Sequence, residues 1–218
     1  MLFQGDAEVL APAMANVRQE ASEWIRVGVL VAVWSTLLYV SKLSLAINWD
    51  SVMQLPTVIT VYATLSYIFT QWLWRLPLLQ GWVVPLPDLQ GTWQGEIRTT
   101  WNDPQTGPNG GPIPVILVIK QTYSSLSCTM HTVNAESRST AAQLSIDGDG
   151  TVRLTYNYTN RPRATVRDQI PMHDGAAILR LVLRPKRCLE GEYWTNRRSI
   201  GDISVKFRSR TMLEEFPG

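Results

Sequence analysis

Two long uncharged stretches lie close together near the N-terminus of this chain. Val27–Ser41 contains no charged residue, and neither does Ser51–Trp74, which runs for 24 residues. A helix needs roughly 20 apolar residues to cross the hydrocarbon core of a bilayer. The sequence therefore predicts a membrane hairpin of two helices within residues 25–75. A helical hairpin buried in a soluble domain is the alternative.

The orientation of this hairpin follows from the charges around it. The connection between the two segments is too short to hold a domain, so the helices should be antiparallel, with both outer ends on one side. Arg18, Arg26 and Arg75 lie on that side, whereas the connecting loop carries only Asp50. Because basic residues favour the cytoplasmic side of a membrane, we expect both termini, and the β-rich domain that follows the hairpin, in the cytoplasm.

Small and hydroxyl-bearing residues recur along both predicted helices. Residues of this kind, spaced by three or four positions, let helices approach closely in lipid. We expect them to hold the hairpin together or to mediate oligomerisation. The candidate positions are Gly28, Ala32 and Thr36 in the first segment and Thr57, Thr60 and Thr64 in the second.

The remaining sequence divides by composition. The N-terminal residues lack the apolar core of a cleavable signal peptide, so we expect the first apolar segment to be retained. Leu2–Gly5 resembles the remnant of a viral 3C-type protease site, and residues 1–5 are given no functional weight. The expected order is an N-terminal segment (1–24), the hairpin (25–75), a stiff proline-containing linker (76–88), a β domain (89–210) and a tail (211–218).

Eight segments of the β domain alternate between apolar and polar residues, with turn-forming residues between them. Eight antiparallel strands with short turns predict a small closed barrel, whose interior is filled or holds one small ligand. A β-sandwich is the alternative. The expected strands are Gly91–Trp101, Ile113–Thr122, Leu126–Thr132, Ala141–Asp147, Thr151–Thr159, Ala177–Leu183, Leu189–Thr195 and Asp202–Arg208.

Catalytic and metal-binding patterns are not found in the sequence. The chain has two histidines without a surrounding motif, and Cys128 and Cys188 form no metal-binding pattern. The segment Asp147–Gly150 resembles the start of a calcium loop, but the twelfth position is Tyr158 instead of the glutamate that such a loop needs. We therefore disfavour an enzyme and expect no cofactor or metal.

The β domain is rich in arginine. From Leu89 onward there are 16 basic and 12 acidic residues, and 13 of the basic residues are arginine, whose planar fork suits phosphate. Tyr193, Thr195 and Arg197 share one strand face, and they point into the barrel if Gly191 marks the crowded inner side. The sequence predicts a lumen for an aromatic, phosphate-bearing ligand; ordinary core side chains are the alternative. The candidate ligand-binding residues are Trp93, Thr99, Trp101, Gln121, Tyr156, Tyr193, Thr195 and Arg197.

Several segments together resemble one known family. They are Leu89–Gly95 at the start of the barrel, Ile119–Thr122, Glu136–Ser139 and Gly191–Gly201 near its end. With the hairpin, they are similar to the CBASS effectors that have two transmembrane helices and a β-barrel. This is the SMODS-associating, β-strand-rich type, also called CD-NTase-associated protein fifteen. The resemblance runs roughly from Trp24 to Arg208.

The resemblance implies a role in bacterial antiphage defence. In this family an infection-triggered nucleotidyltransferase makes a cyclic dinucleotide, which binds the barrel as the activating ligand. The effector then oligomerises and its helices disrupt the inner membrane. The implied partners are a cyclic dinucleotide, the lipid bilayer and further copies of the chain, with no DNA or RNA polymer. Two alternatives remain: a membrane-anchored, lipocalin-like carrier of a lipid, and a scaffold whose barrel is filled.

Overall fold

The computed structural model describes most of the chain after residue 54. The described residues are 35–36, 39, 55–80, 84–100, 102–103, 107–108, 111–168 and 170–216. The chain forms two compact units, residues 1–73 and residues 74–218.

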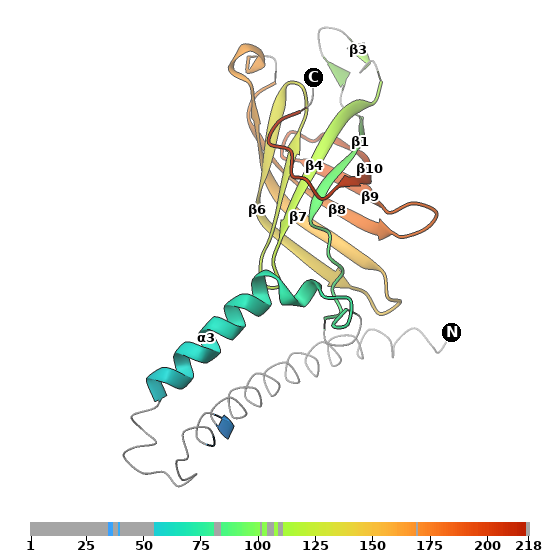
Figure 1. Cartoon of the computed structure of the whole chain (residues 1–218). Coiled ribbons are helices and arrows are strands. Elements are labelled where there is room, and N and C mark those ends of the chain that lie inside the picture. Colours follow the sequence, from blue (N-terminus) through green and yellow to red (C-terminus); the bar gives the residue numbers. More distant parts are fainter. Residues whose placement is uncertain are drawn as a thin grey trace, which may run out of the picture. The chain divides into compact units, whose positions relative to one another are not determined.

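The first unit contains helix α3, Leu55–Gln71, which carries no charged residue (Figure 1). Pro56 lies in its first turn, where the missing N–H group would have no partner within the helix. No helix among the described residues is long and apolar enough to cross a bilayer. The first predicted helix lies outside the described residues, except for Ser35, Thr36 and Tyr39, which are helical.

The second unit is an eight-stranded barrel in which every neighbouring pair of strands is antiparallel (Figure 1). The predicted closed barrel is thereby confirmed. Its strands follow the chain in order, and β1 closes the ring by pairing with both β4 and β10. The strands are β1 (Gly91–Thr99), β4 (Ile113–Gln121), β5 (Leu126–His131), β6 (Ala135–Ile146), β7 (Val152–Pro162), β8 (His173–Val182), β9 (Cys188–Thr195) and β10 (Ile200–Ser209).

Three short elements complete the described structure. The 3-10 turn η1 (Leu73–Arg75) follows α3, and η2 (Ala164–Val166) lies between β7 and β8. The short strands β2 (Asn102–Asp103) and β3 (Gly107–Pro108) pair with each other and form a separate hairpin in the connection between β1 and β4.

The sequence placed the start of β6 too late. We expected it at Ala141, whereas the strand begins at Ala135. The intervening residues are mostly polar, and the register against β7 shifts between Ser139 and Ala141. A bulge of this kind interrupts the two-residue alternation by which strands are recognised in a sequence. The long β6–β7 hairpin was therefore predicted only in part.

Two glycines on the inner face allow adjacent strands to approach closely. A Cβ atom at Gly191 would overlap the main-chain oxygen of Ile178, and one at Gly95 would overlap the main-chain oxygen of Ser204. Gly191 falls between the buried residues Leu189 and Tyr193 on the same face, and Gly95 falls between the buried Trp93 and the partly buried Ile97. The inner position predicted for Gly191 is confirmed. These close contacts let a small barrel bend sharply without a side chain in the way.

The segment after β10 lies against the outer face of the barrel. The Thr92 hydroxyl donates a hydrogen bond to the Thr211 carbonyl (2.6 Å) and accepts one from the Leu213 amide (3.2 Å). Thr92 is fully buried, as is Ile116 on the outer face of β4. Residues 211–213 are therefore part of the barrel unit, although the sequence suggested only a tail.

We predict that Gly191→Ala lowers the free energy of unfolding by about 1–3 kcal/mol, the usual cost of overpacking a core. Gly148→Ala is the matched control, because Gly148 lies in a turn with open space around its Cβ position. The control should change stability by less than about 0.5 kcal/mol. Thermal or urea unfolding of the full chain measures both. Equal stability of the two variants would contradict the close strand approach at Gly191.

Candidate ligand-binding site

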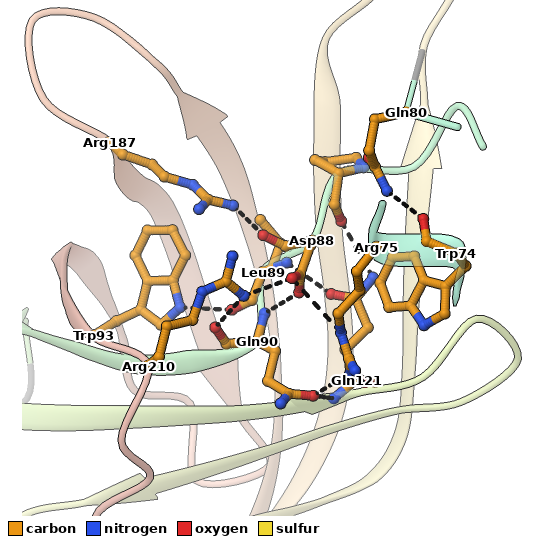
Figure 2. Close-up of polar contacts among 11 residues, drawn as sticks. Trp74, Arg75, Gln80, Asp88, Leu89, Gln90, Trp93, Gln121, Arg187 and Arg210 are labelled. Atoms are coloured by element: carbon orange, nitrogen blue, oxygen red, sulfur yellow. Dashed lines mark hydrogen bonds and ion pairs between the residues drawn. The ribbon is translucent and has the colours of Figure 1, made fainter. Parts of the chain in front are cut away.

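One end of the barrel is sealed by hydrogen bonds from side chains to the main chain (Figure 2). Gln121 is central: its side-chain oxygen accepts a hydrogen bond from the Leu89 amide (2.7 Å), and its side-chain nitrogen donates to the Pro87 carbonyl (3.1 Å). The Trp93 indole donates to the Leu89 carbonyl (2.9 Å). Leu89 and Trp93 are both fully buried. They plug this end, which we call the closed end.

Three arginines surround Asp88 at the closed end. Arg210 Nη1 lies 2.5 Å from an Asp88 carboxylate oxygen and Arg75 Nε lies 3.6 Å from it (Figure 2). Arg187 donates to the Asp88 main-chain carbonyl, and its guanidinium lies 5.3 Å from the centre of the Trp93 ring. Burial and the nearby charge of Arg210 lower the pKa of Arg187. Residues 87–90 are thus fastened to the barrel, and the last residues of the expected linker form part of the closed end.

The opposite end holds a pocket of about 390 Å³. This volume falls within the range usual for small-molecule sites. Its walls come from inner-face residues, and its rim from the turns between β5 and β6 and between β9 and β10. The lining side chains include Ile97, Thr99, Ile113, Met130, Ser137, Tyr156, Tyr158, Asn160, His173, Tyr193, Arg197 and Ile203.

Three tyrosines form the aromatic part of this pocket. The rings of Tyr156 and Tyr158 lie 5.9 Å apart between centres and are tilted by 47°. Burial raises the pKa of Tyr156, Tyr158 and Tyr193. Their hydroxyls therefore stay protonated at neutral pH and can donate hydrogen bonds. The flat rings also offer faces on which a planar base can stack.

Glycines on neighbouring strands let two of these rings lie against the barrel wall. Gly175 pairs with Tyr158 across the strands, and a Cβ atom on it would lie 2.6 Å from the Tyr158 hydroxyl. Gly201 pairs with Tyr193 in the same way, at 2.7 Å from the ring. Both distances are shorter than those at which a real Cβ atom approaches another atom. A larger residue at either position would push a ring away from the wall.

Several polar side chains of the pocket carry hydrogen-bond donors. Ser137 Oγ donates to Asn160 Oδ1 (2.8 Å), so the oxygen of the Asn160 amide is the acceptor in this bond. The N–H groups of the same amide form the other end of the Asn160 side chain. His173 Nδ1 lies 3.1 Å from the Pro171 carbonyl, so this nitrogen is the donor. Arg197 contributes a permanent positive charge. The described lining residues include no carboxylate, so the pocket suits an anion.

The structure brings together half of the residues that the sequence singled out. Thr99, Tyr156, Tyr193 and Arg197 line the pocket. A hydrogen bond joins Thr99 to Tyr193. Thr195 is buried nearby, but its hydroxyl accepts hydrogen bonds from the Arg197 and Ser199 amides in the turn that follows β9.

The other three candidates are placed elsewhere or lie outside the described part. Trp93 and Gln121 are at the closed end, where their polar side-chain atoms bind the main chain. Trp101 is outside the described residues. The alternation along β1 and β4 revealed which residues face inward, but not at which end of the barrel they lie.

Several pocket residues were not predicted, although the sequence carried a partial signal for them. Tyr158 and Asn160 continue along β7 the alternation of the predicted residue Tyr156, and the residues change from apolar to polar toward the end of the strand. Ser137 belongs to the part of β6 that the sequence missed, and His173 has no local motif. His131, the other histidine, is buried outside the main barrel core.

The structure therefore shows a barrel that is sealed at one end and has a polar, aromatic pocket at the other, which we call the open end. The family model for "Cap15, cyclic dinucleotide receptor domain" matches residues 84–207, more than half of the chain. CD-NTase-associated protein 15 of Staphylococcus schleiferi is 25% identical over 170 residues, which cover 78% of this chain and 86% of that protein. The chain belongs to the Cap15 family of CBASS effectors.

The geometry predicts that Gln121 is structural. In Gln121→Ala the buried Leu89 amide loses its partner, which should lower the free energy of unfolding by about 1–3 kcal/mol. Ligand affinity should stay unchanged, because Gln121 lies at the other end from the pocket. Chemical unfolding and ligand titration of the same variant check both parts. A loss of ligand affinity without a loss of stability would mean that Gln121 belongs to the ligand site after all.

Proposed function

We propose that this chain is a cyclic-dinucleotide-gated effector of bacterial antiphage defence. The ligand binds in the barrel pocket, the effector oligomerises, and its N-terminal helices disrupt the inner membrane. The family match over residues 84–207 carries the ligand assignment. The receptor description of that domain also favours a sensor over an enzyme.

The pocket supports this assignment by its chemistry. A cyclic dinucleotide presents two planar bases and two phosphates. The tyrosine rings offer stacking surfaces, and Arg197 and the amide of Asn160 offer donors to anionic or carbonyl oxygens. Because no described lining residue is acidic, a phosphate meets no fixed negative charge. The polar residues also count against a carrier of purely apolar ligands, which would need an apolar lumen.

The membrane part of the proposal is supported by the sequence. Ser51–Trp74 is uncharged throughout, and Arg75 follows it directly. On α3, the Thr60 and Thr64 hydroxyls donate to main-chain carbonyls of their own helix, each at 2.8 Å. Hydroxyls satisfied in this way need no partner on a neighbouring helix. The face Gly28/Ala32/Thr36 of the first segment is therefore the better candidate for oligomer contacts.

A panel of cyclic dinucleotides titrated against the full chain in detergent tests the ligand assignment. At least one should bind, and Arg197→Ala should weaken its binding by about 1.5–3 kcal/mol, because a charge-assisted hydrogen bond to phosphate is lost. This corresponds to roughly 10- to 150-fold in Kd. The unfolding midpoint should hardly change, because Arg197 lies in a turn.

Arg198→Gly is the matched control for Arg197→Ala. Arg198 is exposed, does not line the pocket and has a φ of 62°, which glycine adopts without strain. This variant removes the same charge and should bind normally. Binding by none of the dinucleotides would reject the proposed ligand. A stoichiometric lipid recovered by organic extraction and mass spectrometry would instead support the carrier.

Ala32→Leu tests the proposed oligomer contact. Leucine is favourable in a bilayer, so the helix should still insert, but its bulk should hold the face Gly28/Ala32/Thr36 apart. We expect a variant that fractionates with membranes and binds ligand, yet no longer admits dye into cells when the ligand is supplied. Undiminished dye entry would point to the threonine face Thr57/Thr60/Thr64 instead.

A further inference from the structure

The closed end of the barrel carries an excess of positive charge. Three guanidinium groups surround Asp88: those of Arg75 and Arg210 lie against its carboxylate, and that of Arg187 donates to its main-chain carbonyl (Figure 2). Arg187 Nε is buried without a hydrogen-bond partner, so donors outnumber acceptors here. The Arg210 side chain is 59% exposed, whereas that of Asp88 is only 12% exposed. The cluster therefore presents positive charge outward.

The loop between β8 and β9 adds to this charge. Its residues Arg184 and Lys186 are exposed, and the loop contains no acidic residue. Arg187 fastens the loop to residue 88, which places it at the same end. The acidic residues of the β6–β7 turn offset the charge only in part, since Asp147 is paired with Arg153.

Exposed leucines accompany these basic residues. Leu76, Leu78 and Leu183 are 47%, 84% and 65% exposed, and they are the only exposed leucines among the described residues of the barrel unit. Leu76 and Leu78 lie within three residues of Arg75 in the chain, and Leu183 begins the basic β8–β9 loop. Exposed leucines beside Arg and Lys are typical of surfaces that lie in the headgroup region of a membrane.

We propose that the closed end of the barrel binds anionic phospholipid headgroups. The guanidinium groups contact lipid phosphates, and the leucines enter the boundary between headgroups and acyl chains. The position in the chain supports this occupant, because Arg75 comes only four residues after α3 ends at Gln71. The inference rests on the proposed function, since it requires the N-terminal segment to enter a bilayer.

This assignment gives the barrel two separate anion sites. The pocket takes a diffusible ligand at the open end, whereas the closed end binds the lipid surface through an open patch that combines charge and apolar side chains. The leucines favour a lipid over free phosphate, because a soluble anion offers them no apolar partner. Attraction of basic residues to an anionic lipid surface is strong enough to orient a domain when several act together.

The experiment uses the full chain reconstituted into vesicles with brominated acyl chains. A fluorophore is attached at Leu183→Cys, which is far from α3 in the sequence, and in a second sample at Met172→Cys near the pocket. Both native cysteines are buried, so labelling is selective. The fraction of phosphatidylglycerol in phosphatidylcholine is varied, and bromine quenching of each fluorophore reports contact with lipid.

We expect the fluorophore at 183 to be quenched increasingly as phosphatidylglycerol is added, and the one at 172 to stay unquenched. Arg210→Gln should raise the phosphatidylglycerol fraction for half-maximal quenching about fivefold, the effect of one charge at a lipid surface. Arg210→Lys keeps the charge and should behave like the unaltered chain. Added salt should also weaken the quenching at 183, because it screens the attraction between the arginines and the anionic headgroups.

Other results would overturn the inference. One such result is quenching at 183 that does not depend on the phosphatidylglycerol fraction, and another is quenching that is the same in Arg210→Gln as in the unaltered chain. Either result would mean that the barrel touches lipid without recognising anionic headgroups. Absence of quenching in a chain that resists alkaline extraction from the vesicles would reject the lipid site and leave the proposed function standing. A chain that alkaline extraction removes would reject the membrane part of the proposed function and this inference with it.

Discussion

The barrel depends on the pairing of β1 with β4 on one side and with β10 on the other. This pairing closes the ring of strands, so that no edge is left unpaired. It requires the β10 main chain to approach β1 at Gly95 more closely than any side chain would allow. The same strand then supplies Trp93 to the closed end and Thr99 to the pocket. One strand thus determines both how the barrel closes and where its cavity lies.

The two ends use polar side chains in opposite ways. At the closed end, Gln121 and Trp93 bind main-chain groups that would otherwise be buried without partners. At the open end, donors such as Asn160 and Arg197 face a cavity. A buried polar group is costly unless it is satisfied, so the closed end is stable without a ligand. The open end has donors that an anionic ligand can use.

The sequence predicted the barrel well because strands such as β7 alternate clearly between buried and exposed residues. It failed where that alternation stops: at the start of β6, where a bulge and polar residues hide the strand. Inward positions such as Gln121, Trp93 and Tyr193 were also recognised. Their assignment to one end or the other needed the register between the paired strands, which has no local signal in the sequence.

The remaining pocket residues show a second limit of sequence reasoning. Asn160 and His173 come from segments before and after the loop between β7 and β8, and nothing nearby in the sequence marks them as partners. The arginines at the closed end were equally hidden. Arg75, Arg187 and Arg210 are separated by more than one hundred residues at the widest, yet they meet around Asp88 because the first and last parts of the barrel unit lie together.

The fastening of Thr211 and Leu213 to Thr92 has a consequence for the order of events during synthesis. The ribosome releases β1 long before β10 and residues 211–213 are synthesised. Until then β1 lacks its pairing with β10 and the hydrogen bonds of Thr92. Such long-range contacts are slow to form. A nascent or prematurely terminated chain has its apolar N-terminal stretch but lacks Tyr193 and Arg197. The pocket that these residues line therefore forms only when translation is essentially complete.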